Sequence, residues 1–185
     1  MENTSCRCSW VKLSNPIYIK YHDEEWGIPL HDDRALYELF ILETFQAGLS
    51  WETILNKREN FRRAYEGFIP AHVAAFDAKK IDVLMQDAGI VRNRRKIEAS
   101  IINSRIFLNI AAEYGSFDCY IWGFTDGTSI RESCALRTTS PLSDKIAKDL
   151  KQRGMKFVGS TCIYSTLQAI GILSAHTDDC DWGKS

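Results

Sequence analysis

The stretch Gly154-Met155-Lys156-Phe157-Val158-Gly159-Ser160-Thr161 joins two predicted helices and decides how the C-terminal half of the chain folds. Pro141 and Ser143 open the first helix, which ends at Arg153, and the second helix runs from about Ser160 to Ile170. Glycine lets a backbone approach a ligand closely, and a helix start presents N–H groups to an anion such as a DNA phosphate. The pattern is typical of a helix-hairpin-helix element. An ordinary helix pair with a glycine packed in its turn is the alternative that these residues leave open.

Helices are predicted for most of the remaining chain. Asp32 and Asp33 can cap a helix that runs to Ala47, and Ser50 can cap the next, which begins at Trp51. Further helical segments are predicted over residues 60–65, 70–76, 77–87, 92–114 and 117–122, with irregular structure before residue 32 and a loop over residues 126–139. No segment alternates apolar and polar residues as a strand does, so the predicted fold class is all-α.

The charge of the chain is nearly balanced. With 185 residues and a formal net charge of −1, the sequence suits a single domain with its own core. The small net charge argues against a nonspecific coat on a polyanion, although local basic patches leave nucleic acid open as a partner. We interpret the basic clusters within residues 57–63, 92–96 and 151–156 as solvated helix surface.

The cysteines and the apolar segments bear on the compartment. The six cysteines lack a disulfide spacing and the start of the chain lacks the pattern of a secretory signal, so a cytoplasmic protein is expected. Cys119, Cys134 and Cys162 are then expected to be plain thiols. No apolar run reaches membrane-spanning length, so no membrane partner is expected.

Two pairs of cysteine and histidine, far apart in the sequence, predict one divided metal site. Cys8 precedes His22 in the first segment, and His176 and Cys180 are spaced i,i+4 in the last. Two thiolates and two imidazoles suit one structural Zn²⁺, which would join the two segments. Acid should release the metal, because the ligands must be deprotonated. Incidental buried cysteines are the alternative, and Cys6 stands close enough to compete with Cys8.

Glu43 lies in the segment Leu42-Glu43-Thr44-Phe45-Gln46-Ala47-Gly48-Leu49-Ser50-Trp51, near the end of a mostly apolar helix. A carboxylate at such a position is costly unless it has a partner. The helix stop and the new helix start can bring Trp51 near Glu43, and a carboxylate beside an aromatic face suits a flat cationic or amide-rich ligand such as a nucleobase. A solvent-reaching glutamate and a core tryptophan are the alternative.

Aromatic, acidic and histidine side chains crowd the segment Tyr18-Ile19-Lys20-Tyr21-His22-Asp23-Glu24-Glu25-Trp26-Gly27. Because the segment shows no clear period, we interpret it as the wall of a pocket. Core packing of its aromatic residues is the alternative. The acids over residues 23–25 also suit the first turn of a helix.

Taken together and in order, these segments resemble the bacterial 3-methyladenine DNA glycosylase I family. The matching motifs are Cys8-Ser-Trp10, Pro16 to Gly27, Leu42 to Trp51, Gln86 to Ile97, Arg153 to Thr161, and the pair His176 and Cys180. The resemblance covers nearly the whole chain. The family has a Cys, His, His, Cys zinc site whose first cysteine stands two residues before a tryptophan, which favours Cys8 over Cys6.

The resemblance implies a helix-hairpin-helix DNA glycosylase fold in one domain over residues 1–185. Residues of about 70–170 would form the lobe with the hairpin, and the terminal segments would form a zinc-stapled lobe. The implied reaction is hydrolysis of the N-glycosidic bond of 3-methyladenine in alkylated double-stranded DNA, which releases the free base and leaves an abasic site without strand cleavage. A monomer is the simplest expectation.

The resemblance also implies roles for single residues. Glu43 is expected to contact the extruded base as the catalytic carboxylate, with Tyr21 and Trp51 around the ring. The other expected pocket residues are Tyr18, Trp26 and Trp10, and the expected contacts to the DNA backbone are Lys156, Val158, Gly159, Ser160 and Thr161. Because the family does without a water-orienting aspartate, Asp178 and Asp179 are assigned no role.

Two other functions stay open on the sequence. The chain can be a zinc-stabilised module of the same fold that binds DNA or a nucleobase without catalysis, although the intact set of Glu43, Tyr21 and Trp51 argues against this. It can also be a zinc-stapled helical interaction protein with no affinity for alkylated duplex. Release of the free base would distinguish the glycosylase from both of these alternatives.

Overall fold

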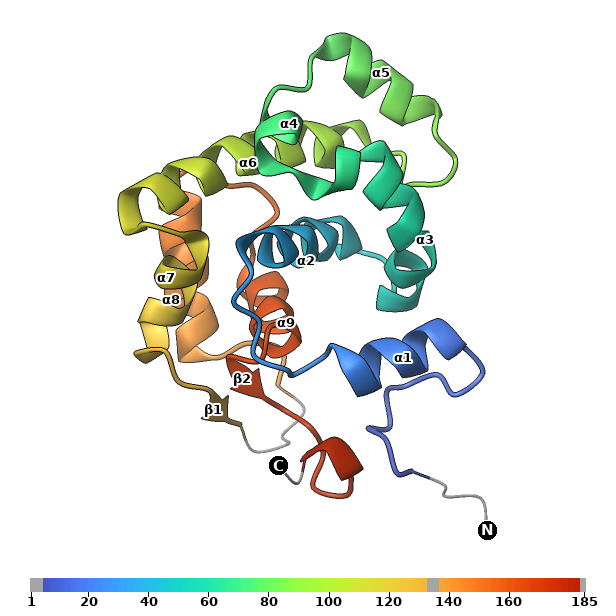
Figure 1. Ribbon diagram of the computed structural model, residues 1–185, viewed down its shortest axis with the longest axis vertical. Helices are drawn as coiled ribbons and strands as arrows, with labels where there is room; N and C mark the ends of the chain where they lie inside the picture. The colour runs from blue at the N-terminus through green and yellow to red at the C-terminus, as the bar shows by residue number, and fades with distance from the viewer. Residues whose placement is uncertain (1–4, 133–136, 184–185) are drawn as a thin grey trace.

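The computed structural model describes residues 5–132 and 137–183, and helices dominate it (Figure 1). The helices are α1 (Pro16–Glu24), α2 (Asp33–Gln46), α3 (Trp51–Ala64), α4 (Pro70–Ala74), α5 (Ala78–Gln86), α6 (Arg94–Tyr114), α7 (Phe117–Trp122), α8 (Pro141–Gln152) and α9 (Ser160–Ala169). Short elements add the 3₁₀ helices η1 (Glu66–Phe68), η2 (Gly123–Thr125) and η3 (Asp181–Gly183) and the strands β1 (Ile130–Arg131) and β2 (Leu173–Ser174). The prediction of a predominantly helical fold is confirmed.

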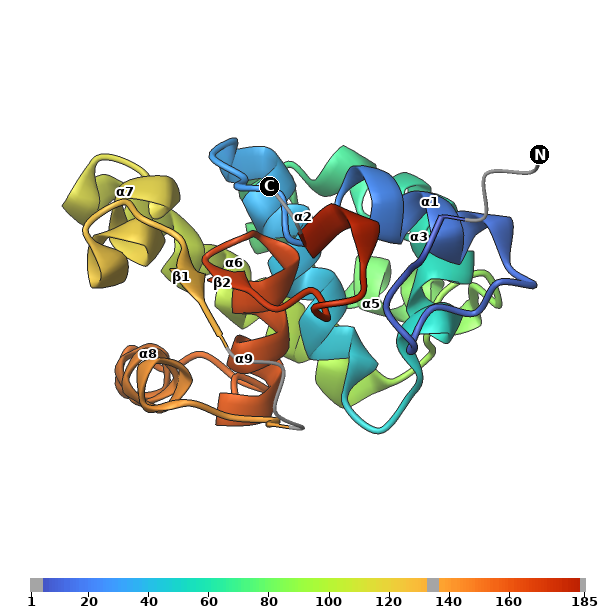
Figure 2. The same cartoon turned by 90° about the horizontal axis from the view of Figure 1, so that it is seen from below.

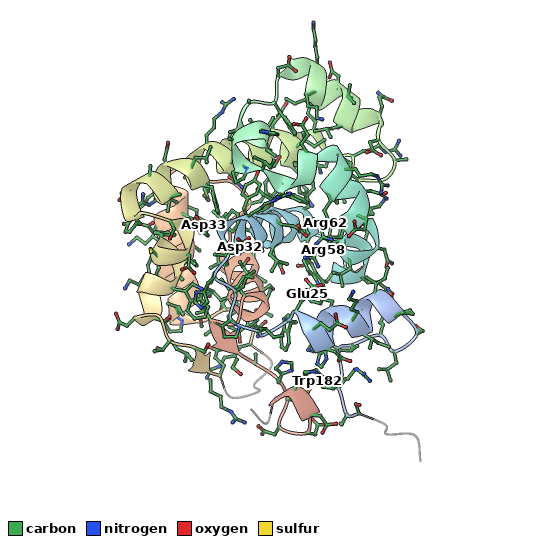
Figure 3. All side chains as sticks on the ribbon, in the orientation of Figure 1. Glu25, Asp32, Asp33, Arg58, Arg62 and Trp182 are labelled. Atoms are coloured by element: carbon green, nitrogen blue, oxygen red, sulfur yellow. The ribbon has the colours of Figure 1, made fainter. Side chains whose placement is uncertain are left out.

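Helix α2 runs through the centre of the molecule and packs against α3, α6, α7 and α9 (Figure 1 and Figure 2). Asp32 caps it as predicted, because its side chain accepts a hydrogen bond from the backbone three residues on, at 2.8 Å. The neighbouring Asp33 carboxylate accepts from the N–H groups of Phe117 and Asp118, which fixes the start of α7 against α2 (Figure 3). The helix that carries Glu43 is therefore held from several sides.

Helices α8 and α9 pack against each other and are joined by a short turn, as predicted. Ser140 and Ser143 form a capping box at the start of α8, in which each side chain accepts from the N–H of the other residue. The Ser143 hydroxyl also lies 2.8 Å from the hydroxyl of Ser160, the first residue of α9. These bonds fix the starts of the two helices relative to each other.

Helix α1 corrects the sequence analysis, which expected irregular structure before residue 32. Pro16 stands in the first turn, and the Asn15 side chain accepts from the backbone two residues on at 3.1 Å, so both start signals are present. The buried residues Tyr18, Tyr21 and His22 follow the i, i+3, i+4 spacing of a helix. The period is hidden in the sequence because the buried face includes a polar histidine.

Helix α3 is continuous, whereas two separate helical pieces were predicted. Its middle is polar, and ion pairs attach it to the neighbouring helices. Arg58 donates to the Glu25 carboxylate after α1 at 2.6 Å, and Arg62 donates to Glu38 in α2 at 2.8 Å (Figure 3). These tertiary contacts hold a segment that has little apolar period of its own.

Strands β1 and β2 pair in parallel, with Ile130 opposite Leu173 and Arg131 opposite Ser174. The sequence predicted a loop around β1 because two residues are too few for an alternating pattern. The pair depends on a contact between distant segments, which the local sequence does not contain.

The structure bears on two expectations from the composition, the state of the cysteines and the absence of a membrane-spanning segment. Cys119 and Cys162 are free thiols, as expected, while Cys134 lies outside the described residues. Within residues 5–132 and 137–183, no helix combines the length and the apolar character that crossing a membrane requires.

Candidate active site and metal centre

A cavity of about 410 Å³ opens between the end of α2, the loop that leads into α3, and the start of α9. Glu43 lies in its wall with 4 % of its surface exposed. The other lining residues come from the α2–α3 junction, from the turn before α9 and from α9 itself: Gln46, Ala47, Gly48, Leu49, Phe157, Gly159, Thr161, Cys162 and Ser165. Two segments singled out in the sequence therefore meet around one carboxyl group.

The Glu43 carboxyl group is buried and incompletely paired. Among the described residues, the buried side-chain atoms that lack a hydrogen-bond partner are Glu43 Oε2 and Trp51 Nε1. Burial raises the pKa of Glu43 to about 8, so the group is largely protonated at neutral pH in the free protein. The alternative of a solvent-reaching glutamate is therefore wrong. Folded proteins pair nearly all buried polar atoms, so an unpaired oxygen in a cavity wall indicates a ligand site.

Tyr18 and Tyr21 extend from α1 towards Glu43. Burial raises the pKa of both hydroxyl groups, and the charge of Glu43 adds to the increase, together with that of Glu52 at Tyr18. The ring of Tyr21 lies 5.4 Å from the ring of Trp51, tilted by 52°. Three of the aromatic residues predicted to bind a base thus lie in the neighbourhood of Glu43, but none of them lines the cavity. Their contact with a base stays a prediction.

Cys8, His22, His176 and Cys180 form a cluster that can hold a metal ion. Their four ligand atoms all lie within 4.8 Å of one another. Cys180 Sγ is 3.5 Å from His22 Nε2 and 3.4 Å from His176 Nδ1, and Cys8 Sγ is 3.5 Å from His176 Nδ1. Burial raises the pKa of the Cys8 thiol to about 11 and lowers the pKa of His176. The predicted set of four residues is therefore brought together.

A second layer of residues orients His22. Its Nδ1 atom lies 2.8 Å from Asp23 Oδ1, which leaves Nε2 for the cluster. Arg7 donates to both oxygens of Asp23, at 2.8 and 2.6 Å, and its guanidinium group lies 5.1 Å from the ring centre of Trp182 (Figure 3). Against the effect of burial, the hydrogen bonds from Arg7 and His22 lower the pKa of Asp23. Trp182, to which the sequence assigned no role, thus supports the cluster.

The turn after α1 holds His176. The ring of His176 lies 4.6 Å from the ring of Trp26, and its imidazole also bonds to the backbone of that residue. Gly27 follows with a φ of +78°, and a Cβ atom there would lie 2.9 Å from His176 Nε2. Any larger residue at position 27 would be strained and would displace the imidazole.

Trp10 and Trp26 lie beside the cluster of Cys8, His22, His176 and Cys180. Their rings are 4.8 Å apart, and Trp10 also lies 5.3 Å from His22 and 5.5 Å from Tyr18. Trp26 is buried, whereas Trp10 is 36 % exposed. The cluster and the tyrosines near Glu43 are therefore connected through aromatic contacts. The predicted roles of Trp10 and Trp26 in base binding stay predictions.

Cys6 lies outside the cluster. It is exposed, and its backbone forms two hydrogen bonds with Asp181: the Cys6 N–H donates to Asp181 Oδ2 at 2.8 Å, and the Asp181 N–H donates to the Cys6 carbonyl oxygen at 2.9 Å. These bonds align the first and last described segments side by side. The N-terminal thiol of the four-residue cluster is therefore that of Cys8 and not that of Cys6.

The turn before α9 is fixed by Asn103 of α6. Asn103 accepts from the N–H of Lys156 at 2.8 Å and donates to its carbonyl oxygen at 2.9 Å. The Val158 side chain is buried, whereas Lys156 and Thr161 are exposed. Gly159 has a φ of −66°, and a Cβ atom there would meet no atom of the described residues within 4 Å. Packing does not require glycine at this position, so the alternative of a packed glycine is wrong for Gly159.

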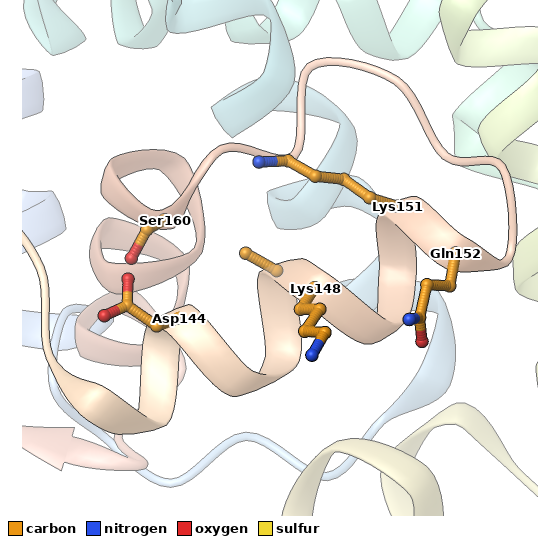
Figure 4. Close-up of a pocket in the computed structure, with 6 residues that line it drawn as sticks. Asp144, Lys148, Lys151, Gln152 and Ser160 are labelled. Carbon is orange, nitrogen blue, oxygen red and sulfur yellow. The ribbon is translucent and has the colours of Figure 1, made fainter.

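A second, shallower hollow lies along α8 (Figure 4). It measures about 360 Å³ and is lined by Asp144, Ala147, Lys148, Lys151, Gln152 and Ser160. Its walls are mostly one exposed helix face, and no buried unpaired carboxyl group stands in the wall. The cavity at Glu43 is therefore the stronger candidate for chemistry.

Lys96 is a residue whose role the sequence missed. It was predicted on the solvated surface with the other basic residues of residues 92–96, but it is 6 % exposed. Its ammonium group donates to the carbonyl oxygens of Phe45 and Ala47, at 2.8 and 2.6 Å, and burial lowers its pKa. Cys162 was also missed as a cavity residue; burial raises its pKa and the charge of Glu43 adds to the increase. The spacing of the sequence contains no signal for either contact.

A buried carboxyl group in a cavity wall, with aromatic residues and a Cys–His cluster nearby, gives this helical protein a candidate site for a small ligand. The family model described as methyladenine glycosylase matches residues 10–183, so the chain belongs to the methyladenine glycosylase family. It is 43 % identical over 181 residues to DNA-3-methyladenine glycosylase 1 of Escherichia coli K12, which covers 94 % of this chain and 95 % of that protein.

Solved structures are similar to the chain over the same extent. A crystal structure of 3-methyladenine DNA glycosylase I is 44 % identical, with a TM-score of 0.91 and coverage of 95 % of this chain and 98 % of that one. A tyrosine-to-phenylalanine variant of 3-methyladenine DNA glycosylase I, in complex with 3-methyladenine, is 37 % identical, with a TM-score of 0.92 and coverage of 97 % and 98 %. The described fold is therefore that of these proteins.

Proposed function

We propose that the protein removes 3-methyladenine from alkylated double-stranded DNA in base-excision repair. It acts as a monofunctional glycosylase, which hydrolyses the N-glycosidic bond, releases the free base and leaves an abasic site. The observation that carries this function is the buried Glu43 carboxyl group, whose unpaired oxygen lies in the wall of a cavity large enough for a base. Family membership and the similar protein in complex with 3-methyladenine support the same substrate.

Glu43 distinguishes the alkylated base from adenine by charge. N3-methylation makes the base cationic, and a cation beside the carboxyl group lowers its pKa from about 8, so that binding favours the carboxylate. The carboxylate can then accept hydrogen bonds from the exocyclic amine and offset the positive charge. Neutral adenine provides no charge that would stabilise the ionised form of Glu43. Extrusion of the damaged base also loses less stacking energy.

The chemistry needs little acid catalysis from the protein. The cationic base is already a good leaving group, so protonation of the base by a general acid is not required. Departure of the base leaves an oxocarbenium-like sugar, whose charge the DNA phosphates and the Glu43 carboxylate can stabilise. Tyr21 and Trp51, with Tyr18 beside them, would enclose the base ring. Asp178 and Asp179 are exposed beside the metal cluster, and neither is proposed to activate water.

Zn²⁺ is the ion that we propose for the cluster of Cys8, His22, His176 and Cys180. A tetrahedral site with Zn–S of about 2.3 Å and Zn–N of about 2.0 Å has sulfur–nitrogen edges of about 3.5 Å, close to the separations of the ligand atoms. The bond between His22 and Asp23 is the outer contact that zinc-binding histidines usually make. The bound ion would cross-link the segment before α1 to the segment after β2 and take no part in bond cleavage.

The turn between α8 and α9 is the proposed DNA anchor, with α8, the turn and α9 as a helix-hairpin-helix element. Gly159 leaves open space at the start of α9, where a strand can approach the backbone. Helix N–H groups at Ser160 and Thr161 suit a phosphate, and the exposed Lys156 adds a positive charge. The buried Val158 side chain holds the turn in the core. We further propose that the protein acts as a monomer in the cytoplasm.

Base release from methylated duplex DNA, with the products separated by chromatography, tests the proposed function. Selective release of 3-methyladenine, with 7-methylguanine left in the DNA, is expected from the metal-loaded protein. Binding of alkylated duplex without release would favour the non-catalytic module of the same fold. Absence of both binding and release in a folded protein would favour an interaction protein.

A further inference from the structure

Phe157 is an apolar side chain that stays exposed in the turn before α9. The backbone of Lys156 is fixed on both sides by Asn103, and the flanking side chains of Met155 and Val158 are buried. Phe157 itself is 39 % exposed, although it is a large aromatic residue. It also lines the cavity that contains the Glu43 carboxyl group. The turn thus presents an apolar ring at the edge of the active-site cavity.

The backbone of Phe157 is strained. Its φ is +57°, in the left-handed region that residues with bulky side chains avoid. Glycine would adopt this conformation without strain. Because 39 % of its surface stays exposed, burial compensates for the strain less than it would for a core phenylalanine. Such backbone outliers persist where the surrounding structure enforces them, and they concentrate at ligand sites.

We propose that Phe157 packs against a nucleotide that flanks the one whose base enters the cavity. This inference rests on the proposed function, because it requires a DNA strand at the cavity. When a nucleotide leaves the duplex, its neighbours lose a stacking partner, and an aromatic side chain can cover the freed face. The ring lies at the cavity edge, where a flanking nucleotide would pass.

The residues beside Phe157 are polar or leave open space, which suits a nucleic-acid strand better than an apolar protein surface. Lys156 is exposed and positively charged, and Thr161 is exposed with a hydroxyl group. Gly159 leaves space for close approach of a strand, because a Cβ atom there meets nothing among the described residues. The ring can contact the face of a base, while the cation, the hydroxyl group and the open backbone beside it can contact the phosphates on either side.

A glycine substitution separates a DNA contact from a packing role. Phe157→Gly removes the ring and suits the φ of +57°, so relief of the strain offsets part of the lost contacts and the melting temperature is expected to stay within a few degrees of wild type, which corresponds to about 1 kcal/mol of stability. The Kd for a duplex with an abasic-site analogue is expected to rise about 5- to 150-fold, the range of one lost stacking contact. Because Phe157 stands at the edge of the cavity, the affinity for free 3-methyladenine is expected to fall much less than the affinity for the duplex. Phe157→Leu, which keeps apolar bulk, is expected to bind the duplex with intermediate affinity.

Val83→Ala is the matched control, because Val83 is an exposed apolar residue on α5, away from the cavity. A lower melting temperature for Phe157→Gly with unchanged duplex affinity would overturn the proposal and make the ring a structural residue. An equal loss of affinity for the free base and the duplex would also overturn it, since the ring would then belong to the base pocket. Wild-type base release is measured in parallel: its absence contradicts the proposed function, whereas the duplex affinities still decide the role of Phe157.

Discussion

The ammonium group of Lys96 lies 2.6 Å from the carbonyl oxygen of Ala47, at the end of the helix that carries Glu43. The same group donates to the Phe45 carbonyl oxygen at 2.8 Å. Helix α2 has no basic residue in its own last turn, so a lysine from α6 satisfies its terminal carbonyl groups. The wall of the cavity at Glu43 is therefore positioned by a contact between two helices distant in sequence.

Lys96→Met is expected to lower the free energy of unfolding by about 1–3 kcal/mol, because two carbonyl oxygens lose a charged donor. Base release is expected to slow as well, since the end of α2 forms part of the cavity. Urea unfolding and single-turnover excision, measured where both proteins are folded, give the two effects. Lys79→Met removes an exposed lysine from α5 and is expected to change neither. Unchanged stability of Lys96→Met would argue that the cap contributes nothing.

Glu43→Gln is expected to slow the excision of 3-methyladenine about 10²-fold or more, because the neutral amide cannot offset the charge of the base. The fold should remain intact, since the side chains have nearly the same shape. Single-turnover release from methylated duplex is the measurement, with circular dichroism as a check on folding. Glu98→Gln, an exposed control on α6, should excise normally. Release by Glu43→Gln at the wild-type rate would remove Glu43 from the mechanism.

The raised pKa of Glu43 predicts a specific pH dependence of stability. The folded pKa of about 8 exceeds the unfolded value of 4.5, so the folded state binds more protons between these values. The contribution of Glu43 is complete below about pH 4.5 and is lost as the pH rises through 8, with a slope of at most about 1.4 kcal/mol per pH unit. Urea unfolding of wild type and Glu43→Gln between pH 5.5 and 8.5 isolates this effect. Parallel curves would mean that the carboxyl group ionises normally.

Cys8→Ser and Cys6→Ser form a matched pair for the metal cluster. Cys8→Ser removes one of the four ligands, so zinc content and melting temperature should fall together, the latter by about 10 °C or more. Cys6→Ser alters an exposed thiol outside the cluster and should retain both. Elemental analysis and thermal unfolding measure the two quantities. Full zinc occupancy in Cys8→Ser would point to a different set of ligands.

Gly159→Ala tests the DNA anchor. The φ of −66° and the open space suit alanine, so stability should stay equal or rise by about 0.4–1 kcal/mol. Affinity for alkylated duplex should fall, because the new methyl group stands where the strand approaches. Gly123→Ala is the control, since Gly123 has a φ of −59° and equally open surroundings. Equal duplex affinity of both variants would move the DNA contact away from Gly159.

The sequence predicted those features that local signals determine. Asp32 and Ser50 are side-chain caps, and the turn between α8 and α9 follows from its glycines. The set of Cys8, His22, His176 and Cys180 was predicted because cysteine and histidine are rare enough for their spacing to stand out, and the structure brings these four residues together. The resemblance to a family contributed the connection between these features.

Other features depend on contacts that no local pattern contains. Lys96 looks like a surface lysine in a basic run, and only the approach of α2 makes it a buried cap. The polar middle of α3 is held as a helix by Arg58 and Arg62, whose partners lie in other segments. The positive φ of Phe157 runs against the preference of bulky residues, so no local signal in the sequence predicts this backbone conformation.

The distance in sequence between the two halves of the Cys–His cluster has a consequence for biosynthesis. Cys180 follows His22 by 158 residues, and a ribosome adds about 5–20 residues per second. Helix α1 is therefore made on the order of ten seconds before the second half of the Cys–His cluster exists. During this interval His22 cannot form its contact with Cys180. Since α9 lines the cavity at Glu43, that cavity is likewise complete only after nearly all of the chain has been made.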